Sequence, residues 1–307
     1  MRSFSSLDHL VENFRNRRPI RAGSLIISVY GDAITHRGGT VWLGSLIKLL
    51  EPLGLNHRLV RTSVFRLAKE NWLTAEQVGR RSYYSITGSG RRQFEKAFKR
   101  IYAAQNPEWD GRWLMVLLGQ LTTEQRQELR QELEWYGFGS LAPGVLLHPQ
   151  MKRAELQGII QEQSYQNDVI VLDSLNEEVT ASRAMRRQIR ESWNLEKLSD
   201  SYQHYLDQFR PIWNELKDQG TPSPEQCFMI RLLLVHEFRR IMLRDPELPE
   251  ELLPSDWTGS AARQLCGNIY QQTWRAAEAH MDQALETAEG PLPPPNTSFY
   301  KRYGGLK

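Results

Sequence analysis

The sequence predicts an α+β protein built in three parts, and three patterns along its 307 residues carry this prediction. Residues 1–104 show three helix-like segments, a hairpin and a further helix, an order typical of a winged helix-turn-helix. Residues 105–178 alternate apolar strands with helices, which favours a ferredoxin-like α+β fold. Residues 179–307 are helical nearly throughout, apart from a Pro-rich tail. We therefore expect an N-terminal winged helix-turn-helix, a central ferredoxin-like domain and a C-terminal all-helical domain.

Two predicted helices begin the first part. The segment 24–34, SLIISVYGDAI, is apolar enough for a core helix and ends before the HRGG break. Residues 40–54 follow with a wide apolar face, and Pro52 and Gly54 end this second helix.

A third helix and a hairpin complete the first part. Asn56 is a suitable N-cap for a helix over residues 57–70. The segment 72–87 predicts two short strands around Gly79, and therefore a hairpin with a basic tip. Residues 90–104 then form a charged amphipathic helix that links to the central part.

The central part alternates strands and helices over about 65 residues. Its first strand is residues 112–119, RWLMVLLG, and its last is DVIVLDSL. Between them the sequence predicts a helix in TTEQRQELRQELEWYG, one strand in LAPGVLLHP and a helix in MKRAELQGIIQEQ. The glycines of residues 137–144, GFGSLAPG, match no phosphate-loop spacing, so we expect a turn there.

The last part is helical from Thr180 to about Ala288, with breaks marked by proline. Residues 289–307 are Pro-rich and poor in helix formers. We expect this tail to wrap a surface or to be mobile.

Charge is distributed unevenly along the chain. The net charge is only +3, but residues 1–104 hold 18 Lys and Arg against 7 Asp and Glu, a balance of +11. The other 203 residues hold 21 against 29, a balance of −8. A basic first third joined to an acidic remainder predicts that the first part binds a polyanion, and nucleic acid is the leading candidate.

The third helix concentrates this positive charge on one face. On a helical wheel its charged side chains lie opposite an apolar face formed by Val60, Val64, Leu67 and Ala68. The helix contains no acid before Glu70, so its basic face repels itself unless a polyanion neutralises it. We therefore expect it to enter the DNA major groove while the hairpin tip reaches flanking DNA as a wing. The predicted DNA-binding residues are Arg58, Arg61, Thr62, Phe65, Arg66, Lys69, Arg80 and Arg81.

Other functional classes lack support in the sequence. Cys227 and Cys266 are far apart and have no zinc-site spacing. No HExxH, Walker A, GxGxxG or GxSxG motif is present. No apolar run approaches the roughly 20 residues of a membrane span, and the N-terminus lacks a secretory signal. We expect a cytoplasmic protein that is not an enzyme, with no metal, no bound cofactor and no membrane partner.

Several long segments resemble the PaaX family. They are SVYGDAITHRGGTVWLGSLIKLLEPLGLNHRLVRTSVFRLAKENWL, GRRSYYSIT, WDGRWLMVLL and HEFRRIMLRDPELPEELLPSDWTGSAARQL, in that order along the chain. The resemblance implies a transcriptional repressor of phenylacetate catabolism that binds operator DNA as a homodimer and is released by phenylacetyl-CoA. It further implies a Cas2-like fold with dimer contacts for residues 105–178. We expect effector binding within residues 179–307, from the chemistry of that segment.

A CoA thioester would need cationic, aromatic and apolar surface together, because it carries three phosphate groups, an adenine and an aryl group. The helical segment MIRLLLVHEFRRIMLRDPELP is apolar almost all round, so its arginines need partners. These are either ligand phosphates or nearby acids such as Glu237 and Asp245. A histidine such as His236 is more often a core residue than a ligand contact, and a tryptophan such as Trp257 is more often a packing anchor. The candidate ligand-binding residues are His236, Arg239, Arg240, Trp257 and Arg263.

Two other functions remain as alternatives. One is an enzyme, either a metal-dependent nuclease on the Cas2-like domain, with Asp110 and Asp173 as candidate ligands, or a CoA-thioester hydrolase. The other is a repressor that responds to a different aryl-CoA.

Overall fold

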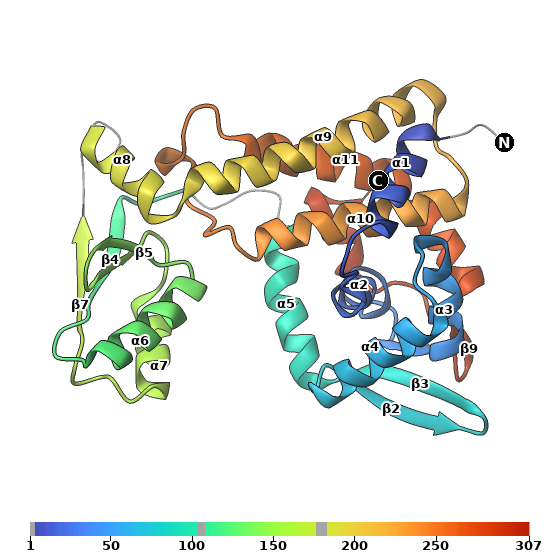
Figure 1. The fold of residues 1–307 in the computed structure, drawn as a ribbon, viewed down its shortest axis with the longest axis horizontal. Coiled ribbons are helices and arrows are strands. Elements are labelled where there is room, and N and C mark those ends of the chain that lie inside the picture. The colour runs from blue at the N-terminus through green and yellow to red at the C-terminus, as the bar shows by residue number, and fades with distance from the viewer. Residues whose placement is uncertain (1–3, 103–107, 176–182, 307) are drawn as a thin grey trace. The chain divides into compact units, whose positions relative to one another are not determined.

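The computed structural model describes residues 4–102, 108–175 and 183–306, which combine helices with three small sheets (Figure 1). The chain divides into two compact units. The first consists of Met1–Ala104, Gln203–Arg240 and Ser260–Lys307, and the second of Gln105–Tyr202 and Ile241–Gly259. C-terminal helices therefore fold together with the first third of the chain. The three-part division expected at residues 105 and 179 stays a prediction.

The first unit begins with helices and a three-stranded antiparallel sheet in the order β1-β3-β2. The elements are α1 (Ser5–Arg15), α2 (Ala22–Val29), a π-helix (Tyr30–Ile34), β1 (Thr40–Trp42), α3 (Leu43–Leu50), a 3₁₀ turn (Glu51–Leu53), α4 (His57–Lys69), β2 (Leu73–Val78), β3 (Arg81–Ile86) and α5 (Gly88–Tyr102). The hairpin predicted over residues 72–87 is confirmed as β2 and β3. Figure 1 shows it extending outward beyond α4.

One local prediction in this region needs correction, and one helix was missed. Residues 40–42 form strand β1 instead of the first turn of a helix, because Val41 is buried and pairs with Tyr84 of β3. Gly44 then allows α3 to begin, since a Cβ atom there would lie 2.3 Å from the Trp42 ring. Helix α1, whose apolar side chains are buried, was not predicted from the sequence.

Three long helices follow the central region: α9 (Leu195–Gln219), α10 (Pro224–Met242) and α11 (Thr258–Ala284). Parts of all three belong to the first unit. Helix α10 is buried along nearly its whole length within that unit, as its apolar composition predicts.

The tail is packed more deeply than the sequence indicates. It forms a small hairpin of β8 (Glu286–Thr287) and β9 (Gly290–Pro291), then a 3₁₀ segment (Phe299–Gly304). Within that segment the side chains of Phe299 and Arg302 are fully buried. A tail that only wraps a surface or is mobile is therefore the wrong description for these residues.

The second unit contains a four-stranded antiparallel sheet in the order β5-β6-β4-β7. Its elements are β4 (Arg112–Leu117), α6 (Thr123–Trp135), β5 (Gly139–Ala142), β6 (Val145–His148), α7 (Arg153–Glu162), β7 (Ile170–Leu175) and α8 (Arg183–Ser192). The first six follow the βαββαβ order of a ferredoxin-like fold. The apolar side chains of α6 and α7 pack on one face of the sheet.

One prediction in this unit is wrong. The segment LAPGVLLHP is part of a hairpin of two strands, β5 and β6, and β5 lies where a turn was expected. The turn itself is confined to Pro143 and Gly144, and Gly144 has a positive φ of 77°. Position 139 of β5 suits glycine because the Trp193 ring packs against it, and a Cβ atom there would come within 2.4 Å of that ring.

Candidate nucleic-acid interface

Helix α4 begins and is held in place by local interactions. Gly54 has a left-handed backbone (φ 79°) after the 3₁₀ turn, which redirects the chain. The Asn56 side chain then accepts a hydrogen bond from the Leu59 N–H at 2.9 Å, as expected for an N-cap. The buried side chains of Val60 and Val64 hold the helix to the unit.

The opposite face of α4 is exposed. Every residue on α4 that the sequence assigned to DNA binding is exposed, including Phe65 at 58%. Arg61 donates to His57 Nε2 at 3.1 Å, and the Lys69 ammonium lies 4.9 Å from the centre of the Phe65 ring. The Thr62 hydroxyl donates to the Arg58 carbonyl at 2.9 Å, which leaves its methyl group for contacts.

Arg66 differs from the other basic residues of α4. Its Nε lies 3.7 Å from Glu70. Its Nη2 lies over Gly23 of α2, so that a Cβ atom added to Gly23 would come within 2.8 Å of this nitrogen. It therefore leans toward α2, at the side of the helix, where a phosphate contact is more suitable than a base contact.

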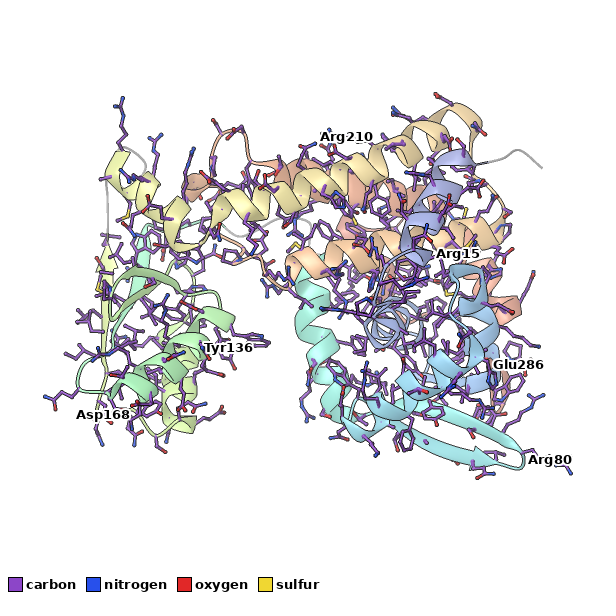
Figure 2. The ribbon with its side chains drawn as sticks, viewed as in Figure 1. Arg15, Arg80, Tyr136, Asp168, Arg210 and Glu286 are labelled. Atoms are coloured by element: carbon purple, nitrogen blue, oxygen red, sulfur yellow. The ribbon has the colours of Figure 1, made fainter. Side chains whose placement is uncertain are left out.

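The two arginines of the β2–β3 hairpin differ in their contacts. Gly79 has a positive φ of 61°, and Arg80 is exposed at the tip (Figure 2). Arg80 has no ion-pair partner among the described residues. Arg81 instead binds Glu286 at 2.7 Å and stacks on Trp42, with 4.2 Å from Cζ to the ring centre.

The candidate ligand residues are only partly brought together. His236 and Arg239 both contact α2: His236 Nδ1 lies 2.9 Å from the Ser28 hydroxyl, and Arg239 donates to the Ser24 hydroxyl at 3.0 Å. Burial, together with the neighbouring arginines, lowers the pKa of His236 to about 3. Burial likewise lowers the pKa of Arg239 to about 10.

The remaining candidates have protein partners of their own. Arg240 is exposed and bound to Glu237 at 3.0 Å, while Arg263 donates to the Arg100 carbonyl at 3.0 Å. Trp257 belongs to the second unit, where its ring packs against Tyr202. The structure therefore does not gather the five candidates into one described site.

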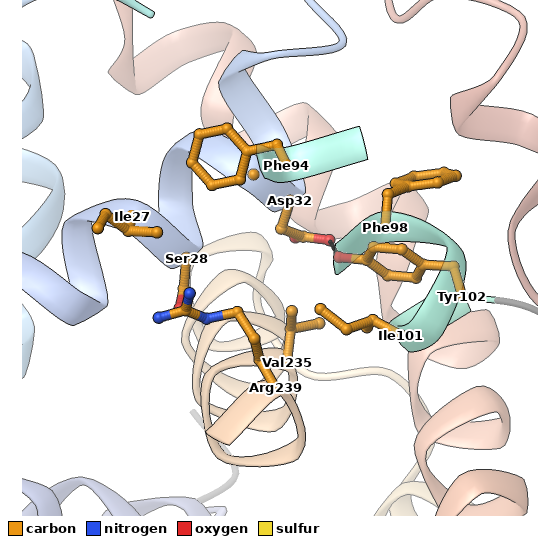
Figure 3. A pocket seen from close by; sticks show the side chains of 10 residues that line it. Ile27, Ser28, Asp32, Phe94, Phe98, Ile101, Tyr102, Val235 and Arg239 are labelled. Carbon is orange, nitrogen blue, oxygen red and sulfur yellow. Dashed lines mark hydrogen bonds between the residues drawn. The ribbon is translucent and has the colours of Figure 1, made fainter. Parts of the chain in front are cut away.

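Arg239 borders a small cavity between α2, α5 and α10, lined mainly by apolar and aromatic side chains (Figure 3). The Nε of Arg239 is buried and has no hydrogen-bond partner among the described residues. The cavity volume is about 20 Å³. Because a water molecule needs at least about 10–15 Å³, this cavity has room for roughly one water and none for a CoA thioester.

Sequence reasoning missed a buried polar cluster centred on Asp32 of the π-helix. Its carboxylate accepts hydrogen bonds from Arg231 at 2.7 Å, Arg302 at 3.0 Å, and the hydroxyls of Tyr102 at 2.6 Å and Tyr270 at 3.0 Å. Burial alone would raise the pKa of Asp32, but the two guanidinium groups hold it below its usual value. The only sequence signal was an acid inside an apolar helical segment.

The two acids considered for a nuclease are engaged elsewhere. Asp173 on β7 binds Arg153 at 2.5 Å, and Asp110 accepts from the Arg112 N–H at 3.0 Å. Within the described ranges, no three His, Cys, Asp or Glu side chains are grouped to hold a metal ion. None of the helices in the described part of the chain is long and apolar enough to cross a membrane.

Family models match most of the chain. The model of the PaaX-like protein matches residues 21–90, the PaaX central Cas2-like domain matches 106–191, and the PaaX-like C-terminal domain matches 193–283. The central Cas2-like domain and the helical C-terminal part are thereby confirmed.

Two known proteins resemble most of the chain. The transcriptional repressor PaaX of Escherichia coli (strain K12) is 42% identical over 303 residues, covering 98% of this chain and 96% of the relative. The uncharacterized protein Rv0674 from Mycobacterium tuberculosis shares the fold, with a TM-score of 0.56 and 20% identity, over 84% of this chain and 97% of its own. The chain belongs to the PaaX family of transcriptional repressors.

Proposed function

We propose that residues 22–86 act as a winged helix-turn-helix that binds operator DNA, with α4 as the recognition helix and the β2–β3 hairpin as the wing. The observation that carries this proposal is the exposed face of α4, where Arg66, through Glu70, is the one cation with a carboxylate partner among the described residues. An arginine there can donate two hydrogen bonds to guanine, and Arg58 and Arg61 both lie on that face.

The test is operator binding by the full chain in a mobility-shift titration over a range of salt concentrations. Arg61→Ala or Arg58→Ala should weaken specific binding by about 5- to 150-fold, the equivalent of 1–3 kcal/mol for a base contact. Arg210→Ala is the matched control, because Arg210 is exposed on α9 on the side of the first unit away from α4 (Figure 2). If both α4 variants bind like the wild type, α4 is not the recognition helix.

We propose that the effector that releases DNA is phenylacetyl-CoA or a related aryl-CoA thioester. Support comes from membership of the PaaX family, together with Arg240, which is exposed on α10 beside Arg239 although Glu237 binds it. Phenylacetyl-CoA, but not free phenylacetate, should lower DNA affinity, since a ligand acts only through its different affinities for the two states. Equal DNA affinity with and without saturating thioester would contradict this proposal.

We propose further that the repressor is a homodimer that uses the central sheet. Strand β7 is an edge strand among the described residues, and its side chains Ile170, Leu172 and Leu175 are 54%, 44% and 59% exposed. An exposed apolar edge is a ready site for pairing with a second copy. Light scattering should give twice the chain mass for the wild type, and Leu172→Glu should shift it toward the monomer.

A further inference from the structure

The wing arginine Arg81 is held by an ion pair with the C-terminal hairpin. Its Nη1 lies 2.7 Å from Glu286 Oε2, and both side chains are about half exposed, at 49% and 47%. Glu286 is the first residue of β8, and β8 lies beside β1. A carboxylate from the far end of the sequence is thus fixed on the wing of the proposed DNA-binding surface.

Several neighbouring groups fix this contact. The Glu286 N–H donates to the Ser45 hydroxyl at 3.3 Å, and the Ser45 hydroxyl donates to the Trp42 carbonyl at 2.8 Å. The Trp42 ring supports the guanidinium of Arg81 from one side. Because Trp42, Ser45 and Glu286 are joined in this way, Arg81 has a defined position before any DNA is present.

The placement of an acid here is unfavourable for DNA binding. A carboxylate on a surface that approaches phosphates repels them, and it also occupies the guanidinium that would bind one. A half-exposed ion pair adds little to folding stability, so stability alone gives little reason for it. A phosphate oxygen offers the same acceptor geometry to Arg81 as the carboxylate does.

We propose that Glu286 occupies the position of a DNA phosphate at the wing: in the free protein it holds Arg81 on Trp42, and in the operator complex a phosphate replaces it. This inference rests on the proposed winged-helix function and adds its regulation. Only Leu285 separates Glu286 from the end of α11. Any change that strengthens the Glu286–Arg81 pair must then weaken DNA binding, by at most the same factor, because the carboxylate and a phosphate compete for one guanidinium.

The proposal predicts a specific salt dependence. Added salt weakens the Glu286–Arg81 pair as well as the contact between Arg81 and a phosphate, so the two effects partly cancel in the wild type. Glu286→Gln removes this compensation. The slope of log affinity against log salt should therefore become steeper, by less than the value of about 0.9 for one whole phosphate contact. Operator affinity should rise about two- to fivefold, the equivalent of losing a competing exposed ion pair.

The experiment compares full-length wild type with Glu286→Gln on operator DNA, by fluorescence anisotropy from low to high salt. Glu289→Gln is the matched control, because Glu289 is exposed on the same hairpin and contacts no arginine among the described residues. It removes the same charge and should leave the salt slope unchanged. In an Arg81→Gln background, Glu286→Gln should no longer change affinity or slope.

Three results would overturn the inference: Glu286→Gln binds no tighter than wild type, Glu289→Gln gives the same gain, or the effect persists without Arg81. Circular dichroism of each variant checks that the fold is kept. Failure of the proposed function looks different, since wild type itself would then bind operator and unrelated DNA equally.

Discussion

Replacement of Asp32 by Asn tests whether the buried cluster holds the proposed DNA-binding elements to the C-terminal helices of the same unit. Asp32 is 4% exposed, and its carboxylate faces Arg231 of α10 and Arg302 of the tail. Asn keeps the shape but removes the charge and turns one acceptor into a donor. Glu278, which also binds Arg231 at 2.5 Å, would remain as the nearby acid, shared with Arg37.

The expected loss is about 3–5 kcal/mol in the free energy of unfolding, because one buried guanidinium is left without a counter-charge. With a urea m-value of about 3 kcal/mol per molar, the midpoint of the first unit should fall by about 1–1.7 M. The depressed pKa of Asp32 means that this contribution is complete above the unfolded pKa near 3.9 and is lost only as pH falls further. The difference between variant and wild type should therefore be constant from pH 5 to 8.

Urea unfolding followed by circular dichroism measures the loss, and hydrogen exchange localises it to peptides of the first unit. Glu289→Gln removes an exposed carboxylate of that unit and should change stability by less than about 0.5 kcal/mol. A loss below about 1 kcal/mol for Asp32→Asn, or one equal to that of Glu289→Gln, would refute the role assigned to the cluster.

Further predictions concern packing and protonation. Val64→Ala, at a fully buried site of α4, should cost about 2 kcal/mol in urea unfolding, yet leave operator affinity unchanged where the variant is fully folded. Phe299→Ala in the tail should cost about 3–5 kcal/mol in thermal unfolding, whereas Tyr300→Ala, at a 42% exposed neighbour, should cost less than about 1 kcal/mol. His236 has a pKa near 3 in the folded state and about 6.5 in the unfolded state, so the unfolded state takes up the proton at a higher pH. Stability should therefore fall as pH drops from about 6.5 to 3, and His236→Gln should flatten this dependence in urea midpoints measured from pH 7 to 4.

The sequence predicted the local features well because they depend on short-range chemistry. The basic and apolar faces of α4 follow from helical periodicity, and its start follows from the Asn56 cap. The β2–β3 hairpin follows from strand alternation around Gly79, whose positive φ suits a tight turn. The eight proposed DNA contacts are all exposed in the structure, and their role stays a prediction.

Features that depend on distant partners were missed or misassigned. β1 is a strand because it pairs with β3, and β5 is a strand because it pairs with β6. The ring of Trp193, which is distant in sequence, packs on Gly139 of β5. The sequence left both a core role and a ligand role open for His236, and tertiary packing places it in the core against Ser28. Short segments of this kind have no periodicity long enough to show their environment.

By itself, the sequence determined the basic and apolar faces of α4, the basic character of the first third of the chain, and the order of strands and helices. Each of these follows from the order of residues along the chain, without knowledge of distant contacts. Only the tertiary structure decided that Asp32 is shared by Arg231 and Arg302, and that Glu286 lies on Arg81. These pairs join residues about 200 or more positions apart. A charged side chain has many candidate partners along a chain, and only folding fixes which one shares its buried or half-buried site.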